Sequence, residues 1–397
     1  MGKSIKKKDL GKGISQRDNG CYVGRYTDNF GKRRYIYDRN LKSLEQKLDL
    51  ARYEKKYGVF GTGESVTLDE FFETYIETYK VGKVKDTTVY RLRQTYAPCA
   101  KNIIGNMNLK DIRAIHIQML INEMEAKGNS YGTISLLKSL LQEMFKIAIG
   151  NRIILTNPCD AIVLPKKVDS QRRFLDEKEQ EMFLNAASTY AHFDIFCVSL
   201  SCGMRIGEVL GLKWSDIDFE HKTVHIQRSL HYSRLSDDEH CHFFFSTPKT
   251  EFSARKIPLL PETEEILERV REKQFTTRML HGKKWHQEPP FEDLVFTTSQ
   301  GSPVRYGDVN RTIKKAVAKA NLIEEELAKV EKREPYYIED FSPHCFRHTF
   351  VTRCKKHGVS YETIQPYVGH SDKEMTKYYD HSKKELEISD FKGVSFF

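Results

Sequence analysis

The sequence of 397 residues lacks the features of several large protein classes. No apolar run approaches the ~20 residues that a helix needs to cross a bilayer. The N-terminus is basic without a following apolar segment, so we expect no secretory signal peptide. The eight cysteines are scattered without a C-x-x-C pair. This predicts reduced thiols in a cytosolic protein rather than a disulfide framework.

Clustered carboxylates, which a metal-dependent nuclease would need, are also missing from the sequence. The run His240-Cys241-His242 contains three zinc-ligand types, but neighbouring residues of a strand point to opposite faces. We therefore expect no metal site and no other cofactor.

The formal net charge of +9 is concentrated at one end of the chain. Residues 1–60 hold 16 Lys and Arg against 7 Asp and Glu, whereas the remaining residues hold 48 of each. A basic N-terminal segment indicates a polyanionic partner, most simply nucleic acid. The alternative is a solvated segment that only aids solubility.

Residues 1–60 read as a small sheet backed by a helix. Two segments, 21–26 and 33–37, alternate as strands around a turn at 29–32, and a third strand is expected near 13–17. The spacing of leucines predicts a helix over 41–57. A two-stranded ribbon fits the major groove of DNA. The side chains expected to face DNA are those of Arg25, Arg33 and Arg34. The alternative is a minor sheet with Tyr22 and Tyr37 in its core.

A Gly-rich linker at 59–65 separates this part from an all-helical domain over residues 65–164. Thr67 and Glu70 form a capping box that opens the first helix. Further helices are predicted over 86–102, 115–127 and 131–149. The candidate DNA-contacting cations are Lys83, Lys85 and Arg91 in this domain, and Lys166, Lys167, Arg172 and Arg173 in the basic linker that follows it.

Residues 173–397 read as a mixed α+β domain. A helix is expected from Leu175 and an apolar helix over 193–201. Three segments, 223–228, 242–246 and 255–258, are expected to form one small antiparallel sheet, with Lys249 at the turn between the last two. A helix is predicted over 310–320, and the charged stretch 322–333 is either helix or extended loop.

Four side chains in the last fifth of the chain suggest chemistry on a phosphodiester without a metal. His344 and Arg347, three residues apart, share one face of a helix. His370 follows a glycine, and Tyr379 comes nine residues later. Each feature alone is more often structural. Their combination provides cations, proton donors and a phenol nucleophile.

The order of these motifs resembles the tyrosine recombinase (phage-type integrase) family. The resemblance runs from about residue 172 to 383, and it includes G-M-R-I-G-E at 203–208 and P-H-C-F-R-H-T at 343–349. More loosely, the N-terminal parts resemble the arm-binding and core-binding domains of integrases of conjugative transposons. The resemblance implies a multidomain fold: a small N-terminal β-sheet plus helix arm-binding domain (1–60), an all-α core-binding domain (65–164) and a mixed α+β catalytic domain (173–397) with a C-terminal tail from about 383.

The resemblance also assigns roles residue by residue. Tyr379 is the nucleophile, because the family has a histidine two residues after it, and His381 fits Tyr379 rather than the adjacent Tyr378. One departure is the stretch 322–341, which is longer than in compact members and whose role stays open. The implied catalytic set is Arg205, Lys249, His344, Arg347, His370 and Tyr379, with Glu208 in a supporting position.

The implied function is site-specific recombination of a mobile element through a 3′-phosphotyrosine, without metal or ATP. Four protomers would act on two duplexes in the bacterial cytoplasm, at the nucleoid. The tail is expected to dock on a neighbouring protomer, and the alternative is that it packs in cis on its own chain. An excision accessory protein is a further candidate partner. Two alternatives remain open: a type IB topoisomerase-like enzyme, and a DNA-binding regulator that does not cleave.

Overall fold

The structure is a computed structural model that describes residues 10–27, 33–57, 66–167, 173–235, 240–246, 254–369, 388–391 and 393–397. The chain divides into two compact units, residues 1–169 with 235–237 and residues 170–234 with 238–397. The described helices include none with the length and hydropathy required to traverse a bilayer.

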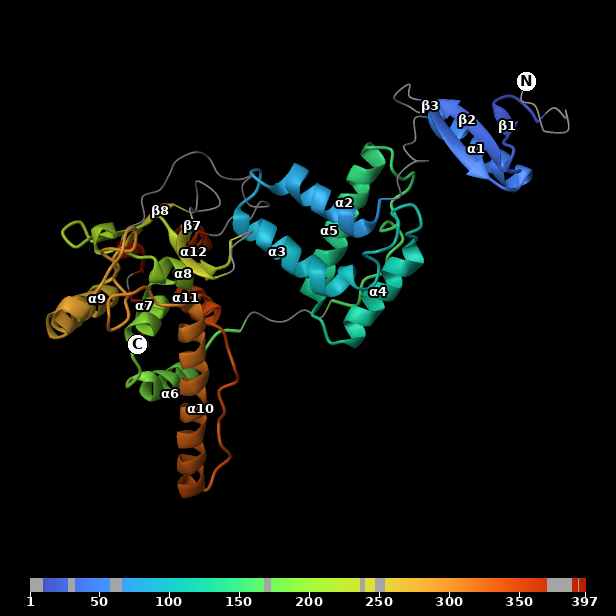
Figure 1. Cartoon of the computed structure of the whole chain (residues 1–397). Helices are drawn as coiled ribbons and strands as arrows, with labels where there is room; N and C mark the ends of the chain where they lie inside the picture. Colours follow the sequence, from blue (N-terminus) through green and yellow to red (C-terminus); the bar gives the residue numbers. More distant parts are fainter. Residues whose placement is uncertain are drawn as a thin grey trace. The chain divides into compact units, whose positions relative to one another are not determined.

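The N-terminal part of the first unit is a three-stranded antiparallel sheet with one helix on it (Figure 1). Helix α1 covers one face, where Leu44 and Leu48 are fully buried against Gly24 of the central strand. The predicted hairpin strands, third strand and backing helix are confirmed, while the predicted turn at 29–32 lies outside the described residues. The elements are β1 (Ile14–Gln16), β2 (Tyr22–Thr27), β3 (Arg33–Asp38) and α1 (Leu41–Tyr57).

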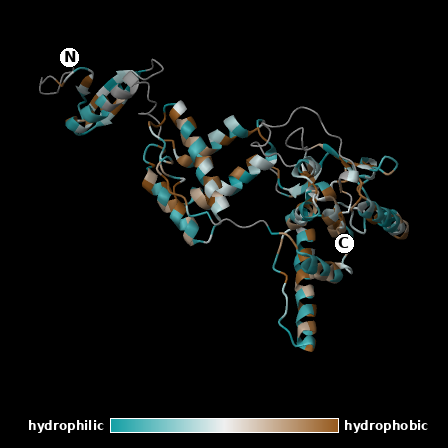
Figure 2. Cartoon of the chain, turned by 180° about the vertical axis from the view of Figure 1, so that it is seen from behind, coloured by the Kyte–Doolittle hydropathy of each residue, from teal (hydrophilic) through white to brown (hydrophobic). Residues whose placement is uncertain are grey.

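The second part of the first unit is helical. The capping box forms as expected: the Thr67 N–H donates to Glu70 Oε2 (2.8 Å), and the Glu70 N–H donates to Thr67 Oγ1 (3.3 Å). Apolar stripes on these helices, visible as brown bands in Figure 2, meet in a core of their own. The helices are α2 (Leu68–Tyr75), α3 (Asp86–Tyr96), α4 (Ala114–Ala126) and α5 (Tyr131–Gly150), with π-helical turns Ile76–Lys80 and Ala97–Lys101 continuing α2 and α3.

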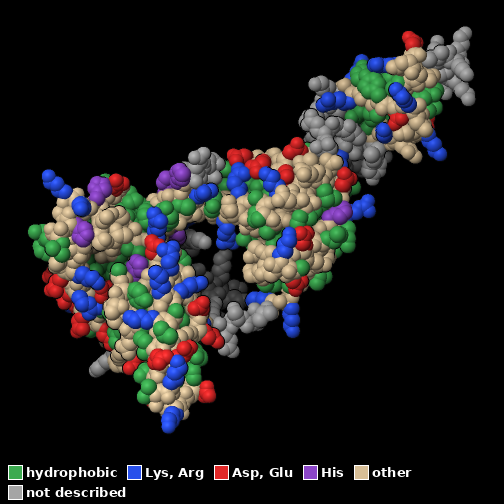
Figure 3. Space-filling model, turned by 60° about the horizontal axis from the view of Figure 1, so that its bottom comes forward, with side chains coloured by type: hydrophobic (Ala, Val, Ile, Leu, Met, Phe, Trp, Pro, Cys, Tyr) green, Lys and Arg blue, Asp and Glu red, His purple; other side chains and the backbone are tan. Residues whose placement is uncertain are grey.

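The second unit has one large apolar core enclosed mainly by helices. Acidic and basic side chains are interspersed over the visible surface of both units (Figure 3), in keeping with the balanced charge after residue 60. The helices are α6 (Glu177–Ala187), α7 (Phe193–Cys202), α8 (Ile206–Leu210), α9 (Pro261–His281), α10 (Tyr306–Glu331), α11 (His344–Lys356) and α12 (Tyr361–Val368).

The described strands of this unit form two sheets, so the prediction that 223–228, 242–246 and 255–258 share one sheet is wrong. One sheet has the order β4-β5-β8, and the other pairs β6 with β7. The polar segment 229–233 was not predicted as a strand; it follows β5 after a short connection and pairs with 242–246. The segments 242–246 and 255–258, which were expected to pair, therefore lie in different sheets, and Lys249 between them falls outside the described residues. The strands are β4 (Ile217–Asp218), β5 (Thr223–Ile226), β6 (Ser229–Ser233), β7 (His242–Ser246) and β8 (Arg255–Pro258).

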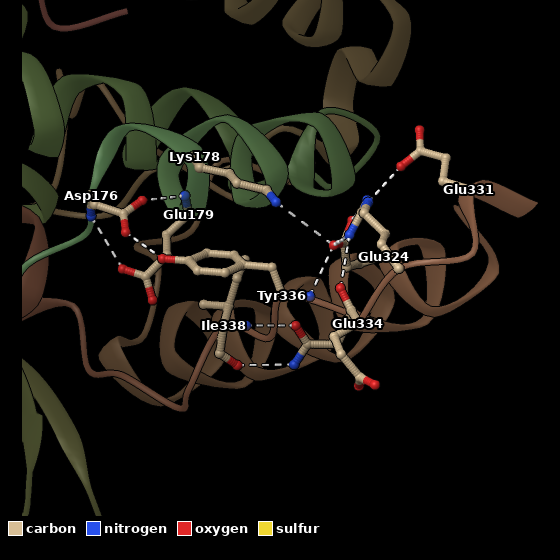
Figure 4. A network of polar contacts seen from close by, with 10 residues as sticks. Asp176, Lys178, Glu179, Glu324, Glu331, Glu334, Tyr336 and Ile338 are labelled. Carbon is tan, nitrogen blue, oxygen red and sulfur yellow. Dashed lines mark hydrogen bonds and ion pairs between the residues drawn. The ribbon is translucent and has the colours of Figure 1, made fainter. Parts of the chain in front are cut away.

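Helix α10 continues without a break through the stretch whose form was left open, and the chain then returns beside it (Figure 1). Glu324 holds the returning segment: Arg333 pairs with its carboxylate, and the Tyr336 N–H donates to its Oε1 (2.9 Å). The Tyr336 hydroxyl also donates to Asp176 at the start of α6 (Figure 4). These contacts fix the return segment to both α10 and α6.

The C-terminal residues pack on the same chain. Phe396 is 2% exposed, and its ring stacks on Phe350 of α11 at 4.9 Å between centroids. Its carbonyl accepts from Gln180 (2.6 Å) and Arg353 (2.8 Å), and its N–H donates to Glu262 (3.1 Å). The described residues of the tail therefore pack in cis, which was the alternative to the expected docking on a neighbouring protomer.

Candidate active site

Arg205 is placed by a sharp turn between two helices. Helix α7 ends at Gly203, whose backbone is left-handed (φ +56°), and α8 starts just after Arg205. A β-carbon on Gly203 would lie 2.4 Å from the Phe350 ring, so a larger residue does not fit. The turn thus fixes the point where the Arg205 side chain leaves the backbone.

Two acceptors hold the guanidinium of Arg205. Its Nη1 donates to Glu208 Oε1 (2.9 Å), and its Nη2 donates to the Gly369 carbonyl (2.8 Å). The side chain is still 40% exposed, and a guanidinium carries five N–H donors. Arg205 can therefore be held by the protein and still donate to a ligand.

Arg347 lies on α11 and is only 1% exposed. Its Nη1 donates to the Gly203 carbonyl (3.0 Å), but its Nε and Nη2 have no partner among the described groups. Burial, together with repulsion from Arg205 and Arg255, lowers the pKa of Arg347 to about 9. A buried cation with two unused donors is the arrangement that an anion would complete.

Glu208 supplies the negative charge beside these arginines. It is 7% exposed, and burial by itself would raise its pKa. The charge and hydrogen bonds of Arg255, with a hydrogen bond from the Arg205 N–H (3.0 Å), outweigh burial, so its pKa lies below the ordinary value. Glu208 therefore stays ionised at neutral pH and fixes Arg205.

His344 is the first residue of α11, one helical turn before Arg347. Its ring is exposed and meets that of His348 edge to face, with 4.6 Å between centroids. The predicted pair thus lies on one helix, and the histidine is the more accessible member. His344 can add a single donor beside Arg347.

The structure brings together Arg205, Glu208 and Arg347, and places His344 one turn from Arg347. The remaining predicted catalytic positions, Lys249, His370 and Tyr379, lie outside the described residues. Sequence reasoning missed Arg255, which donates to both oxygens of Glu208. The available signal in the sequence was strand alternation: Arg255 lies two residues before Ile257, so the two side chains share the face of β8 on which Ile257 is buried.

The predicted arginines of the N-terminal sheet do not share one face. Arg25 lies opposite Tyr35, and Arg33 lies opposite Thr27, on the side away from α1. Arg34 pairs with Tyr26, and Tyr26 packs on the α1 side. Tyr37, considered as core, is 49% exposed, whereas Tyr22 does pack against the leucines of α1.

The other predicted DNA-contacting cations differ in their exposure and in their ion pairs within the protein. Lys83, Lys85, Arg91, Lys166 and Lys167 have exposed side chains. Arg172 lies outside the described residues. Arg173, in contrast, is paired with Glu179 (2.6 Å) and Glu339 (2.7 Å), so its charge is neutralised by the protein. Within the described part of the chain, no group of three or more residues could hold a metal ion.

Comparison with known proteins identifies this arrangement. The phage integrase family model matches residues 173–385, and the phage integrase N-terminal SAM-like domain matches residues 67–125. The transposase from transposon Tn916 of Enterococcus faecalis is 25% identical over 403 residues, covering 96% of this chain and 94% of that protein. A tyrosine recombinase XerC-like protein of Caldanaerobacter subterraneus subsp. tengcongensis is 26% identical over 367 residues, 89% of each chain.

Solved structures give the same result. The Tn1549 transposon integrase in complex with transposon right end DNA is 25% identical, with a TM-score of 0.64 over 80% of this chain and 96% of that chain. A lambda integrase tetramer bound to a Holliday junction is 18% identical and shares the fold, with a TM-score of 0.57 over 96% and 99% of the chains. Since the family match spans more than half of the chain and contains the Arg205–Arg347 site, the chain belongs to the phage integrase family and is a site-specific tyrosine recombinase that cuts and rejoins DNA.

Proposed function

We propose that this recombinase integrates and excises a mobile element, of the conjugative-transposon kind, through a covalent phosphotyrosine at Tyr379. The observation that carries the proposal is the pair of unused donors, Nε and Nη2, on the buried Arg347. A scissile phosphate would supply the anion that these donors lack. The transposon relatives of similar length support the assignment to a mobile element.

The chemistry follows from where charge develops. Attack on phosphorus increases the negative charge on its nonbridging oxygens, and Arg205 and Arg347 are assigned to them as fixed donors. His344 and His370 are assigned single hydrogen bonds to the same phosphate. Donors that are held in place before the reaction need little reorganisation, so a metal ion is not required for this stabilisation.

Tyr379 is assigned as the nucleophile. Its phenol has an ordinary pKa of ~10, and nearby guanidinium charge favours the phenolate. The phenolic oxygen bonds to phosphorus, the bond from phosphorus to the 5′ oxygen breaks, and Lys249 protonates that oxygen. A 3′-phosphotyrosine results. A 5′-hydroxyl of a second DNA then reverses these steps, so no ATP is consumed.

The assembly is proposed from the domain order. Residues 1–60 would bind arm sites and residues 65–164 core sites, while four catalytic domains, 173–397, act on two duplexes. The lambda integrase of similar fold binds a Holliday junction as a tetramer, which supports this number. In the assembly the tail would leave its cis position and dock on a neighbour. An excision accessory protein and a cytoplasmic location at the nucleoid complete the proposal.

A nicked suicide substrate tests the proposed chemistry. The substrate is a duplex with the sequence of the joined ends of the element that encodes the chain. A nick just beyond the cleavage site lets the short fragment that carries the new 5′-hydroxyl diffuse away, so that the strand cannot be rejoined. Wild-type protein should trap covalent DNA in the presence of a metal chelator, and Tyr379→Phe should trap none. Trapping by Tyr379→Phe, or none by wild type, would contradict the assignment. Relaxation of supercoils without paired sites would instead favour a topoisomerase.

A further inference from the structure

Arg255 is a buried arginine at the start of β8. Its side chain is 7% exposed. Its Nη1 and Nη2 donate to the two oxygens of Glu208 (3.2 and 2.9 Å), and its Nε donates to the Tyr367 carbonyl (2.7 Å). One guanidinium therefore connects strand β8, helix α8 and the last turn of helix α12.

The elements that Arg255 connects are those that hold Arg205. Glu208 Oε1 accepts from both arginines, and the Gly369 carbonyl, the other acceptor of Arg205, lies two residues after Tyr367. Displacement of Arg255 would therefore release both supports of the Arg205 guanidinium at once. A loss of either support alone would leave the other in place.

Gly369 packs closely on Arg255. Its backbone is left-handed (φ +67°), and a β-carbon there would lie 3.0 Å from Arg255 Nη1. The end of α12 thus rests against the guanidinium as well as bonding to it. Because of this close contact, a shift of the Arg255 guanidinium would also shift the Gly369 carbonyl.

We propose that Arg255 is a positioning residue for Arg205, which aims the Arg205 guanidinium at the scissile phosphate without touching DNA itself. The inference rests on the proposed function, because it takes Arg205 as a ligand of that phosphate. Arginine is required at this position because its planar fork spans a carboxylate and a carbonyl at fixed angles. A lysine ammonium is a single flexible charge and cannot hold both.

Arg255→Lys tests this role on the nicked suicide duplex. We expect covalent-complex formation to slow by about 100-fold, since a misplacement of about 1 Å costs this much in a positioned site. We expect the Kd for the duplex to change by less than about threefold, because Arg255 makes no contact with the phosphates that dominate affinity.

A second substrate separates mispositioning from general damage. It carries a methylphosphonate at the scissile position, so one charged nonbridging oxygen is replaced by a methyl group. This change removes charge that Arg205 is needed to neutralise. On this substrate Arg255→Lys should therefore form the covalent complex less than about tenfold more slowly than wild type. The charge stabilisation by Arg205 that the variant loses is no longer required there.

Two further variants serve as controls. Arg228→Lys is the matched one, because Arg228 also pairs with a buried carboxylate, but with that of Asp216 rather than that of Glu208. It should cleave both substrates at nearly the wild-type rate. If Arg255→Lys unfolds, the double variant Glu208→Gln with Arg255→Gln removes the buried charges together, and it should show the same deficit and the same rescue.

Three results would overturn the proposal. One is cleavage of the unmodified phosphodiester by Arg255→Lys at the wild-type rate. Another is an equal deficit on both substrates in protein that unfolds at the wild-type temperature, since this would indicate a purely structural role. The third is absence of covalent complex with wild type, which would refute the proposed function and the role of Arg255 with it.

Discussion

Replacing Arg347 with methionine should make the DNA-free protein more stable and inactive. Methionine is unbranched and apolar, so it can fill the space of the arginine stem without a buried charge. The replacement removes a cation that is 1% exposed, together with two donors that have no partner among the described groups. Each unsatisfied buried donor costs about 1–3 kcal/mol.

The opposing loss is smaller. The substitution breaks the hydrogen bond from Arg347 Nη1 to the Gly203 carbonyl (3.0 Å), and a bond of this kind contributes about 0.5–1.5 kcal/mol. Two unsatisfied donors cost about 2–6 kcal/mol together, so the net gain in the free energy of unfolding is about 0.5–5.5 kcal/mol. The sign agrees with the stabilisation found when buried charged groups are replaced by apolar ones. For a catalytic unit of this size, each kcal/mol raises the melting temperature by about 2–4 °C.

Thermal unfolding of the DNA-free protein, followed by calorimetry, measures this effect. Arg255→Met is the matched control: it too removes a buried arginine, but one that is paired with Glu208 (2.9 Å). Because it removes the buried partner that bonds both oxygens of Glu208 and leaves only the partly exposed Arg205 to compensate that carboxylate, it should lower the free energy of unfolding by about 3–5 kcal/mol. Target DNA should stabilise wild type more than Arg347→Met. A melting temperature of Arg347→Met that falls as far as that of Arg255→Met would refute the reasoning.

Three further predictions concern the turn, the tail and the basic surfaces. Gly203→Ala should destabilise the protein by about 1–3 kcal/mol and slow cleavage, because the left-handed turn and the Phe350 ring leave no room; thermal unfolding and the nicked substrate measure both. Phe396→Ala should lower the free energy of unfolding of the single chain by about 3–5 kcal/mol, as measured by thermal unfolding. Truncation of residues 384–397 should lower tetramer formation on DNA in a native gel, and unchanged assembly would count against docking in trans. Arg33→Ala should reduce the slope of log Kd against log salt by about 1, whereas Arg173→Ala should leave it unchanged because Glu179 and Glu339 already neutralise Arg173.

Local signals in the sequence predicted most of the elements. The capping box of Thr67 and Glu70 marked the start of α2 because its two hydrogen bonds involve residues three apart. The helical face shared by His344 and Arg347 was likewise a matter of short spacing. Where both partners of an interaction lie within one helical turn, as in these two cases, the sequence alone was sufficient.

Partners that are distant in sequence were harder to predict. Strand β7 has three consecutive phenylalanines, and nothing in its own sequence shows that it pairs with the polar 229–233 rather than with 255–258. One local element was missed as well: the long helix α9 was not predicted, although Pro261 opens it in the favourable first position. Its apolar residues include the exposed Phe275, Met279 and Leu280, so they do not form one helical stripe. The Glu208–Arg255 pair joins residues 47 apart, and only the tertiary fold brings them together.

The two arginines of the site differ in exposure, and this difference has a mechanistic consequence. Arg205 is 40% exposed and supported by Glu208 and Gly369, so it can meet a phosphate while both remain partly hydrated. Arg347 is almost fully buried with donors unused among the described groups, so its interaction with phosphate gains strength from exclusion of water. The free protein bears the cost of that burial as lower stability. A bound phosphate pairs with the buried charge of Arg347 and so removes this cost, which strengthens binding. The gain is largest in the transition state, where the phosphate carries the most negative charge.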